Sequence, residues 1–178
     1  MTTTLTPVQR SIYLAGPGVF FPDPHAWGQR MTQACQALDL CGLYPLDQYV
    51  PDGLAPVAMR HWIAQANYAL IRRADAVFAD LRAFRSCTEP DSGTAFEVGF
   101  AHALGKPVWL WLPDCTPDTR MKDRVPGANG EPPRDADGLF IEDFDAPHNL
   151  MLWEAAAGIS YGGEVEDALA EMARVLFR

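Results

Sequence analysis

The sequence predicts a single domain of the α/β class, built on an open parallel sheet with helices on both faces. Three observations support this prediction. The chain has 178 residues, which suits one domain with a single core. Short apolar runs alternate with longer segments of helical periodicity, and the apolar runs are continuous, as in strands buried on both faces. No internal repeat or low-complexity tract divides the chain.

The first half of the chain contains three of the predicted strands. Ser11–Ala15 is an apolar run that ends at Gly-Pro-Gly, which is typical of a buried strand that meets a turn. The next two elements are a helix over Pro24–Leu40 and a short strand over Gly42–Leu46, which contains a proline near its end. Pro56–Arg73 has apolar residues at three- and four-residue spacing and predicts a long helix, and Asp75–Ala79 predicts a third buried strand.

The second half begins with a predicted helix over Ser92–Leu104 and a fourth strand over Pro107–Leu112. The segment Pro113–Pro147 is rich in proline, glycine and aspartate, and loops of this length are usually functional. Within this segment, Gly138–Ile141 predicts an edge strand. Two further helices are predicted, over Asn149–Ala156 and Glu164–Phe177.

Composition excludes several classes of partner. The formal net charge is −9, so polymeric DNA or RNA would be repelled. No run approaches the roughly 20 apolar residues that span a bilayer, and the N-terminal MTTTLTPVQR has no apolar signal core, so we expect a cytoplasmic protein. The four cysteines form no C-x-x-C pair and the four histidines are scattered, so we expect free thiols and no metal.

The predicted fold gathers candidate functional residues at one edge of the sheet. Ligands of parallel α/β sheets bind at the carboxyl ends of the strands. This rule brings together Gly16, Asp47, Asp80 and the start of the helix at Ser92. The sequence therefore predicts a ligand site at this edge.

A single carboxylate interrupts an apolar helix pattern in this region. Gly93, Glu97 and Ala101 share one helix face, and helical side chains lean toward the N-terminus, so Glu97 projects over a glycine into an open notch. An exposed glutamate in a cleft can attack an anomeric carbon and form a glycosyl ester, while a second carboxyl group, here Asp80, protonates the leaving group.

Each of these acidic residues also has a plain structural interpretation. Glu97 could be a solvated surface residue, and Asp80 could be a turn former at a strand end. Asp91 or Ser92 could cap the helix, since both residue types favour that position. None of these interpretations explains why Glu89, Asp91 and Glu97 crowd together.

Three motifs carry a resemblance to a known family. The run Asp75–Val108, DAVFADLRAFRSCTEPDSGTAFEVGFAHALGKPV, resembles the core motif of the nucleoside 2-deoxyribosyltransferases. IYLAGPGVFF, over Ile12–Phe21, is similar to the first strand and turn of that family, and NLM, over Asn149–Met151, to a late Asn-x-Met element. The motifs occur in the family's order and span most of the chain, and the central one is highly specific.

The resemblance implies a flavodoxin-like (Rossmann-like) fold, a homo-oligomer, and transfer of a 2-deoxyribosyl group between purine or pyrimidine bases through a glutamyl ester, without a cofactor. The substrates would be 2′-deoxynucleosides and free nucleobases. Glu97 matches the family's nucleophile, Asp80 the acid near the base, and Tyr13 the residue that orients the nucleophile. Asp91 matches the residue that holds the sugar 5′-hydroxyl.

Four more residues are implied to bind substrate. Asn149 and Met151 match residues that a neighbouring subunit donates to the site, and Asp47 and Gln48 are candidates for base recognition. The sequence also departs from the family: Arg85-Ser86 stands where members have Arg-Gly, and the 113–147 segment is longer than in compact members. Both departures bear on the base pocket rather than on the chemistry, so base preference stays open.

Other functions remain as alternatives. A related N-hydrolase cleaves deoxynucleoside 5′-monophosphates, but its relatives carry a serine where this chain has Asp91, and a carboxylate repels a phosphate dianion. A nucleoside hydrolase would use the same glycosyl ester, with water as the acceptor. A sensor domain that binds a nucleotide-like ligand would not need an exposed Glu97. A dinucleotide-binding oxidoreductase is disfavoured, because GPGVFF lacks the third glycine of that fingerprint.

Overall fold

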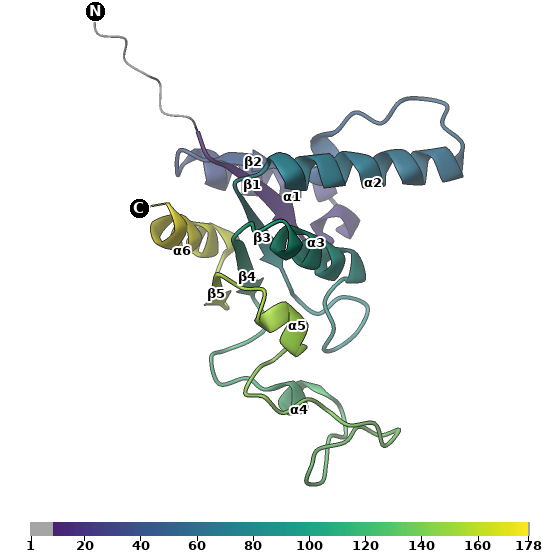
Figure 1. Ribbon diagram of the computed structural model, residues 1–178, viewed down its shortest axis with the longest axis vertical. Helices are drawn as coiled ribbons and strands as arrows, with labels where there is room; N and C mark the ends of the chain where they lie inside the picture. The colour runs from purple at the N-terminus through teal and green to yellow at the C-terminus, as the bar shows by residue number, and fades with distance from the viewer. Residues whose placement is uncertain (1–8, 178) are drawn as a thin grey trace, which may run out of the picture.

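The computed structural model describes residues 9–177, and a five-stranded parallel sheet forms its centre (Figure 1). The strand order is β2-β1-β3-β4-β5, with every neighbouring pair parallel. The strands are β1 (Ser11–Ala15), β2 (Cys41–Leu43), β3 (Ala76–Asp80), β4 (Val108–Leu112) and β5 (Gly158–Tyr161). The predicted open parallel sheet is therefore confirmed. Residues 1–8, on which most of the expectation about secretion depends, lie outside the described residues.

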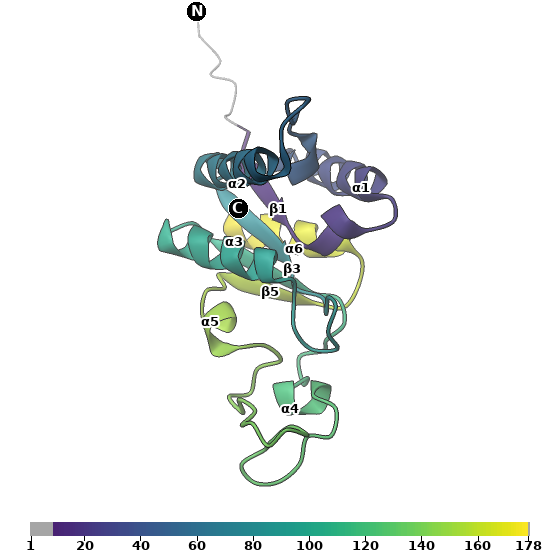
Figure 2. The same ribbon diagram turned by 90° about the vertical axis from the view of Figure 1, so that its right-hand side faces the viewer.

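Helices cover both faces of this sheet (Figure 2). The longer helices are α1 (Pro24–Gln36), α2 (Pro56–Arg73), α3 (Ser92–Ala103) and α6 (Val165–Leu176). The short elements are η1 (Pro17–Phe20), η2 (Pro45–Asp47), α4 (Met121–Arg124) and α5 (Leu150–Trp153). The described helices include none with the length and hydropathy that a membrane span requires.

The core has two parts, one on each face of the sheet. Because strand side chains alternate between faces, Tyr13 of β1 packs with α2 and α3, whereas Ile12 and Leu14 pack with α1 and α6. β3 and β4 are buried along their whole length. This two-sided burial explains the continuous apolar runs in the sequence.

One predicted strand is shorter than expected, and another was wrong. β2 ends at Leu43, and the chain turns into the 3-10 helix η2, because Pro45 has no N–H with which to extend the ladder. The edge strand predicted over Gly138–Ile141 does not form; Arg134 makes only an isolated bridge with Phe140.

The edge of the sheet is instead β5, which the sequence did not predict. β5 pairs with β4, and Gly158 lies opposite Trp109. A Cβ atom at Gly158 would lie 2.0 Å from the Trp109 ring, so only glycine fits there. A four-residue strand between Ala-Ala-Ala and Gly-Gly gives little periodicity to recognise.

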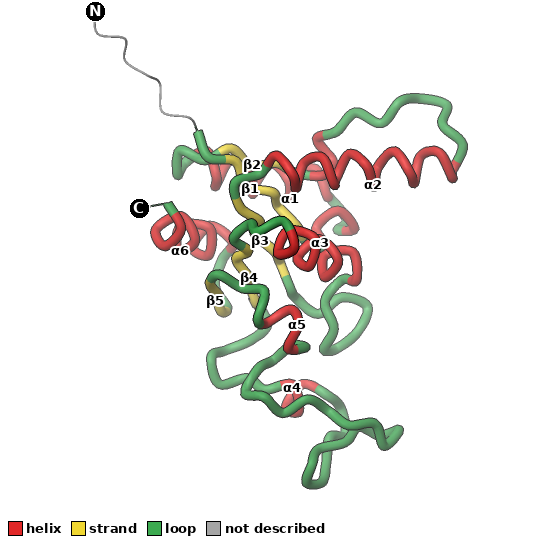
Figure 3. Tube along the Cα trace, viewed as in Figure 1, coloured by secondary structure: helices red, strands yellow, loops and turns green. Residues whose placement is uncertain are grey.

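The segment between β4 and α5 is almost entirely loop and extends away from the sheet (Figure 3). It is nevertheless tied to the fold. Met121, Ile141 and His148 are buried, and Arg124 forms an ion pair with Asp114 at 3.0 Å. Asp114 also accepts a hydrogen bond from the backbone N–H of Ala83, which links this segment to the loop after β3.

Candidate active site

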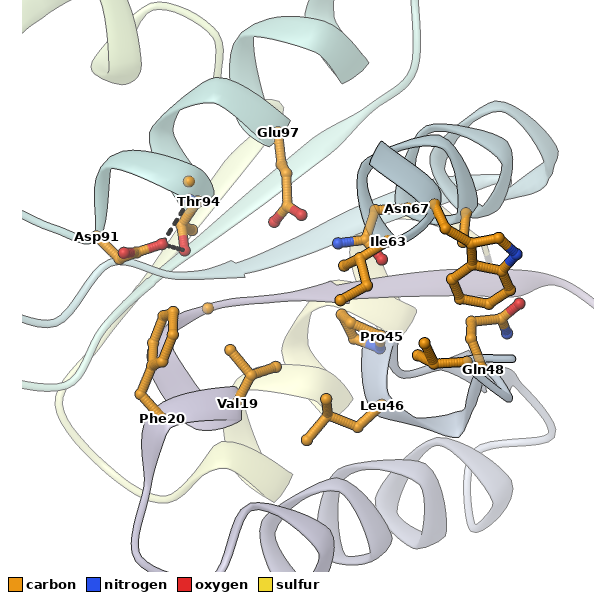
Figure 4. Close-up of a pocket in the computed structure, with 15 residues that line it drawn as sticks. Val19, Phe20, Pro45, Leu46, Gln48, Ile63, Asn67, Asp91, Thr94 and Glu97 are labelled. Atoms are coloured by element: carbon orange, nitrogen blue, oxygen red, sulfur yellow. Dashed lines mark hydrogen bonds between the residues drawn. The ribbon is translucent and has the colours of Figure 1, made fainter. Parts of the chain in front are cut away.

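A cavity of about 340 Å³ opens at the carboxyl end of β1, between η1, η2, α2 and the start of α3 (Figure 4). This position follows the rule for parallel α/β sheets. The volume lies within the range of small-molecule sites. Three polar side chains that face the cavity are Asp91, Glu97 and Asn67, and Gly16 and Gly93 contribute backbone to its wall.

Glu97 lies on α3 and points its carboxylate into the space between Asp91 and Asn67 (Figure 4). The buried hydroxyl of Tyr13 donates to Oε1 of Glu97 at 2.5 Å. Burial raises the pKa of Glu97 to about 7, the charge of Asp91 adds to this effect, and the hydrogen bond from Tyr13 opposes it. Among residues 9–177, Oε2 of Glu97 has no hydrogen-bond partner. The carboxylate is therefore held at one oxygen and presented to the cavity at the other.

Tyr13 acts here as a fixed donor. Burial and the adjacent Glu97 both raise the pKa of Tyr13 above its ordinary value, so the phenol keeps its proton. Its position in the middle of β1 is rigid, because that strand pairs on both sides. The prediction that Tyr13 lies beside Glu97 is consistent with this geometry.

Asp91 both caps α3 and lines the cavity. Its Oδ2 accepts from the backbone N–H of Thr94 at 2.9 Å and from Oγ1 of Thr94 at 3.1 Å. Asp91 is therefore the N-cap of α3, as one interpretation of the sequence suggested, and it is also part of the cavity wall. A Cβ atom at Gly93 would lie 2.9 Å from the same Oδ2, so the glycine leaves room for this cap.

Asp80 does not line the cavity. It lies at the end of β3 with 1% of its surface exposed, and burial raises its pKa. Gly16, which does line the cavity, passes directly over it: a Cβ atom at Gly16 would lie 2.7 Å from the Cβ of Asp80. Asp80 is therefore the immediate neighbour of a residue that lines the cavity.

The remaining predicted residues divide into two groups. Gln48 lines the cavity, whereas Asp47 is exposed on η2 and is not part of the wall. Asn149 caps α5, accepting from the backbone N–H of Met151 and donating to Glu142, and Met151 is 74% exposed. α5 lies on the opposite side of α3 from α2 (Figure 2), so neither Asn149 nor Met151 belongs to this cavity.

Sequence reasoning missed the wall that α2 provides. Trp62, Ile63, Ala66 and Asn67 all line the cavity, and the side chain of Asn67 faces Glu97 across it (Figure 4). Ile63 belongs to the apolar periodicity that predicts this helix, and it is 40% exposed. The sequence does contain a signal for this wall. Asn67 follows Ile63 by one helical turn, so an amide lies among apolar residues on one face of the helix.

The loop after β3 reaches the rim of the cavity through aromatic stacking. Phe20, a wall residue, stacks on Phe84 with ring centroids 5.2 Å apart. The Arg85 guanidinium lies over both rings, at 5.2 Å and 4.7 Å. Arg85, part of the Arg85-Ser86 departure from the family pattern, therefore contacts a residue of the cavity wall.

Fold and site together define a class of protein: a parallel α/β domain that presents carboxylates to a cavity at the strand ends. The model of the nucleoside 2-deoxyribosyltransferase family matches residues 12–151, and the chain belongs to that family. This confirms the family predicted from the three motifs.

Solved structures and a sequence relative agree with this assignment. A 2-desoxiribosyltransferase from Leishmania mexicana is 34% identical with a TM-score of 0.70, over 94% of this chain and 99% of that one. An uncharacterized protein of Schizosaccharomyces pombe is 30% identical in an alignment over 159 residues, with coverage of 79% of this chain and 74% of that protein.

Two more distant structures support the fold alone. A 2-deoxyribosyltransferase from Bacillus psychrosaccharolyticus has a TM-score of 0.57 at 22% identity, over 88% of each chain. A CMP N-glycosidase from Clostridium botulinum has a TM-score of 0.51 at 11% identity, over 93% of this chain and 98% of that one. The same architecture is thus found in a transferase and in a glycosidase.

Proposed function

We propose that this protein exchanges the base of 2′-deoxynucleosides through a covalent glutamyl-deoxyribosyl intermediate, with retention of configuration. The observation that carries the proposal is the Glu97 carboxylate in the cavity, which accepts a hydrogen bond from the Tyr13 hydroxyl at 2.5 Å and has no cationic partner among residues 9–177. A carboxylate held in this way suits attack on C1′ of a sugar. Family membership supports the same reaction.

The proposed reaction has two matched halves. The free oxygen of Glu97 attacks C1′, the bond from C1′ to the base nitrogen breaks with its electrons on the base, and Asp80 supplies a proton to that base. A second base then attacks C1′, the ester bond breaks with its electrons on Glu97, and Asp80 recovers a proton. Two inversions at C1′ give net retention. No cofactor takes part.

Asp91 favours nucleosides over nucleotides in this proposal. Its carboxylate lines the cavity and can accept a hydrogen bond from a neutral 5′-hydroxyl. A 5′-phosphate would bring two negative charges against Asp91 and near Glu97, which is repulsive. The substrates we propose are therefore 2′-deoxynucleosides and free nucleobases. The apolar wall from η1, η2 and α2 suits the flat face of a base, with the Gln48 amide available to its edge.

We also propose a homo-oligomer in which Asn149 and Met151 complete the cavity of a neighbouring subunit. The support is that Met151, on α5, is 74% exposed and does not line the cavity of its own subunit. Exposed apolar side chains on α2 and α3, including Val57, Met59 and Phe96, offer further contact area.

The test is product analysis with deoxyinosine and adenine. We expect deoxyadenosine and hypoxanthine with little free deoxyribose, and we expect the E97A variant to be inactive but folded. A slow fluorinated nucleoside analogue should leave its sugar on the peptide that contains Glu97, as detected by mass spectrometry. Free deoxyribose as the main product would indicate a hydrolase instead. Preference for deoxynucleoside monophosphates would contradict the role of Asp91.

A further inference from the structure

A closed ion pair lies directly beneath the cavity. Nε of Arg82 donates to both carboxylate oxygens of Asp80, at 2.8 Å and 3.0 Å, and the backbone N–H of Arg82 donates to Oδ1 at 3.1 Å. Asp80 is buried, and the Arg82 side chain is 28% exposed. While the pair is closed, Asp80 accepts at both oxygens.

Three aromatic rings enclose the other end of this pair. The guanidinium carbon of Arg82 lies 5.0 Å from the ring of Phe21, 5.3 Å from Trp27 and 5.2 Å from Trp111. Trp27 and Trp111 also stack on each other. A cation at these distances is attracted to each ring face. The aromatic cage of Phe21, Trp27 and Trp111 therefore fixes the charge of Arg82 beside Asp80.

We propose that Arg82 is a positioning residue for base exchange: it orients the Asp80 side chain and is the counter-ion of Asp80 whenever its proton is on the leaving base. The proposal rests on the proposed function. It also rests on the close approach of Asp80 to Gly16, a residue of the cavity wall: a Cβ atom at Gly16 would lie 2.7 Å from the Cβ of Asp80.

The chemistry of exchange explains why such a counter-ion is useful. When a base leaves, the proton of Asp80 moves to a base nitrogen and the O–H electrons stay on the carboxylate. When a base returns, that carboxylate takes up the proton that the incoming base releases. Burial favours the protonated form of Asp80 and Arg82 favours the carboxylate, so their opposition keeps both forms accessible.

Few other charges face Asp80 within residues 9–177. Asp114, after β4, acts in the same direction as burial and raises the pKa of Asp80. Asp114 is itself paired with Arg124 of α4. His148 contacts Arg124, and burial lowers the pKa of His148 to about 4, so its ring is neutral near pH 7. Arg82 is the cation that bonds Asp80 directly.

The test compares the pH profile of kcat for exchange between deoxyinosine and adenine in R82M and in the unmodified protein. Exchange requires protonated Asp80, so its rate falls as pH rises through the pKa of this group. Without Arg82, we expect this alkaline limb to move to higher pH by about one unit or more. R82Q, which is neutral but keeps a hydrogen-bonding head, should move the limb in the same direction.

A matched control is R30M. Arg30 also lies over Trp27, at 5.5 Å, but pairs with Glu164 and Glu166 rather than with Asp80. R30M also removes an arginine charge from the face of the Trp27 ring, and its pH profile of kcat should match that of the unmodified protein. An unshifted alkaline limb in folded R82M and R82Q would overturn the inference. A protein that exchanges no bases and forms no adduct at Glu97 would instead refute the proposed function.

Discussion

At the scale of single residues, the central feature is Glu97, whose surroundings disfavour its ionised form. Glu97 lies where burial and Asp91 both oppose its ionisation, and only the phenol of Tyr13 favours it. A nucleophile must be ionised to react, so the proposed activity should be lost as pH falls through about 7.

The first prediction concerns Tyr13. Y13F removes the hydrogen bond that lowers the pKa of Glu97, so the acid limb of the kcat profile should move to higher pH. At pH 7 the rate should fall roughly tenfold or more, since a hydrogen bond to a charged group contributes about 1.5–3 kcal/mol. Steady-state exchange assays from pH 5 to 9 measure both effects. An acid limb at the same pH in both proteins would contradict this account of Tyr13.

The second prediction concerns stability. The pKa of Glu97 is raised from 4.5 to about 7 on folding, so the folded state binds the proton more tightly and stability falls as pH rises between these values. Above pH 7 the buried charge should cost about 1–3 kcal/mol. E97Q removes this cost and should raise the free energy of unfolding at pH 8, with little change near pH 4.5. Urea denaturation at pH 8 and at pH 4.5 measures the free energy of unfolding of E97Q and of the unmodified protein. An equal increase at both pH values would show that the charge of Glu97 is not the cause.

Individual residues of the site differed in how far the sequence could predict them. Glu97, Asp91, Gly16 and Gln48 all line the cavity, and their roles in binding or catalysis stay predictions. Local helix-face and strand-end rules indicated Glu97 and Gly16, whereas Asp91 and Gln48 were implied by the family resemblance. Asp80 does not line the cavity. Its close approach to Gly16 follows from the pairing of β1 with β3, which the residues around Asp80 do not reveal. Asp80 and Arg82 are only two residues apart, but the rings around Arg82 come from segments far apart in the chain, so no local pattern indicates the aromatic cage.

At the scale of elements, α3 is a helix whose two glycines have different surroundings. A Cβ atom at Gly93 would meet Oδ2 of Asp91 at 2.9 Å, whereas one at Gly99 would meet nothing within 4 Å. Alanine in a helix interior is more stable than glycine by about 0.5–1 kcal/mol when nothing opposes it.

The third prediction compares G93A with G99A. G99A should raise the free energy of unfolding by about 0.5–1 kcal/mol and leave the KM for deoxynucleosides unchanged. G93A should lack this gain, because the methyl group displaces Asp91 from its cap on Thr94, which contributes about 1 kcal/mol. Its KM should rise severalfold. Thermal unfolding and steady-state kinetics test the pair, and identical behaviour of the two variants would contradict the role of Gly93.

The elements themselves were predictable where they were long and periodic. β1, α2 and α6 lie within one residue of their predicted bounds. β5 was missed because four residues carry too little pattern, and Trp109, which requires its glycine, is distant in sequence. Periodicity predicts α2 as a helix, but it does not distinguish residues of a core from residues of a cavity wall.

At the scale of the whole molecule, the proposed assembly makes the fourth prediction. E97A lacks the nucleophile, and M151D would place a charge in the cavity of a neighbour. Each variant alone should be nearly inactive. A mixture that exchanges subunits should recover up to about a quarter of normal activity, because each mixed dimer contains one site with both native residues.

Two controls make this mixing experiment decisive. Met151 is 74% exposed on its own chain, so M151D should leave the packing of that chain intact. Subunit exchange is verified with tagged chains before activity is measured. Full activity of M151D alone, or no recovery in a verified mixture, would refute a shared site.

The two cavity carboxylates lie on a single rigid element, Asp91 at the start of α3 and Glu97 further along it. The wall facing them is contributed by η1, η2 and α2, which are separate pieces of chain. In the proposed reaction, the pentose would contact two carboxylates held at a fixed spacing, and the base would contact segments that can be changed one at a time. Libraries that randomise only wall residues of η1, η2 and α2 should therefore yield variants that accept unnatural bases, while the interactions with the pentose are unaltered.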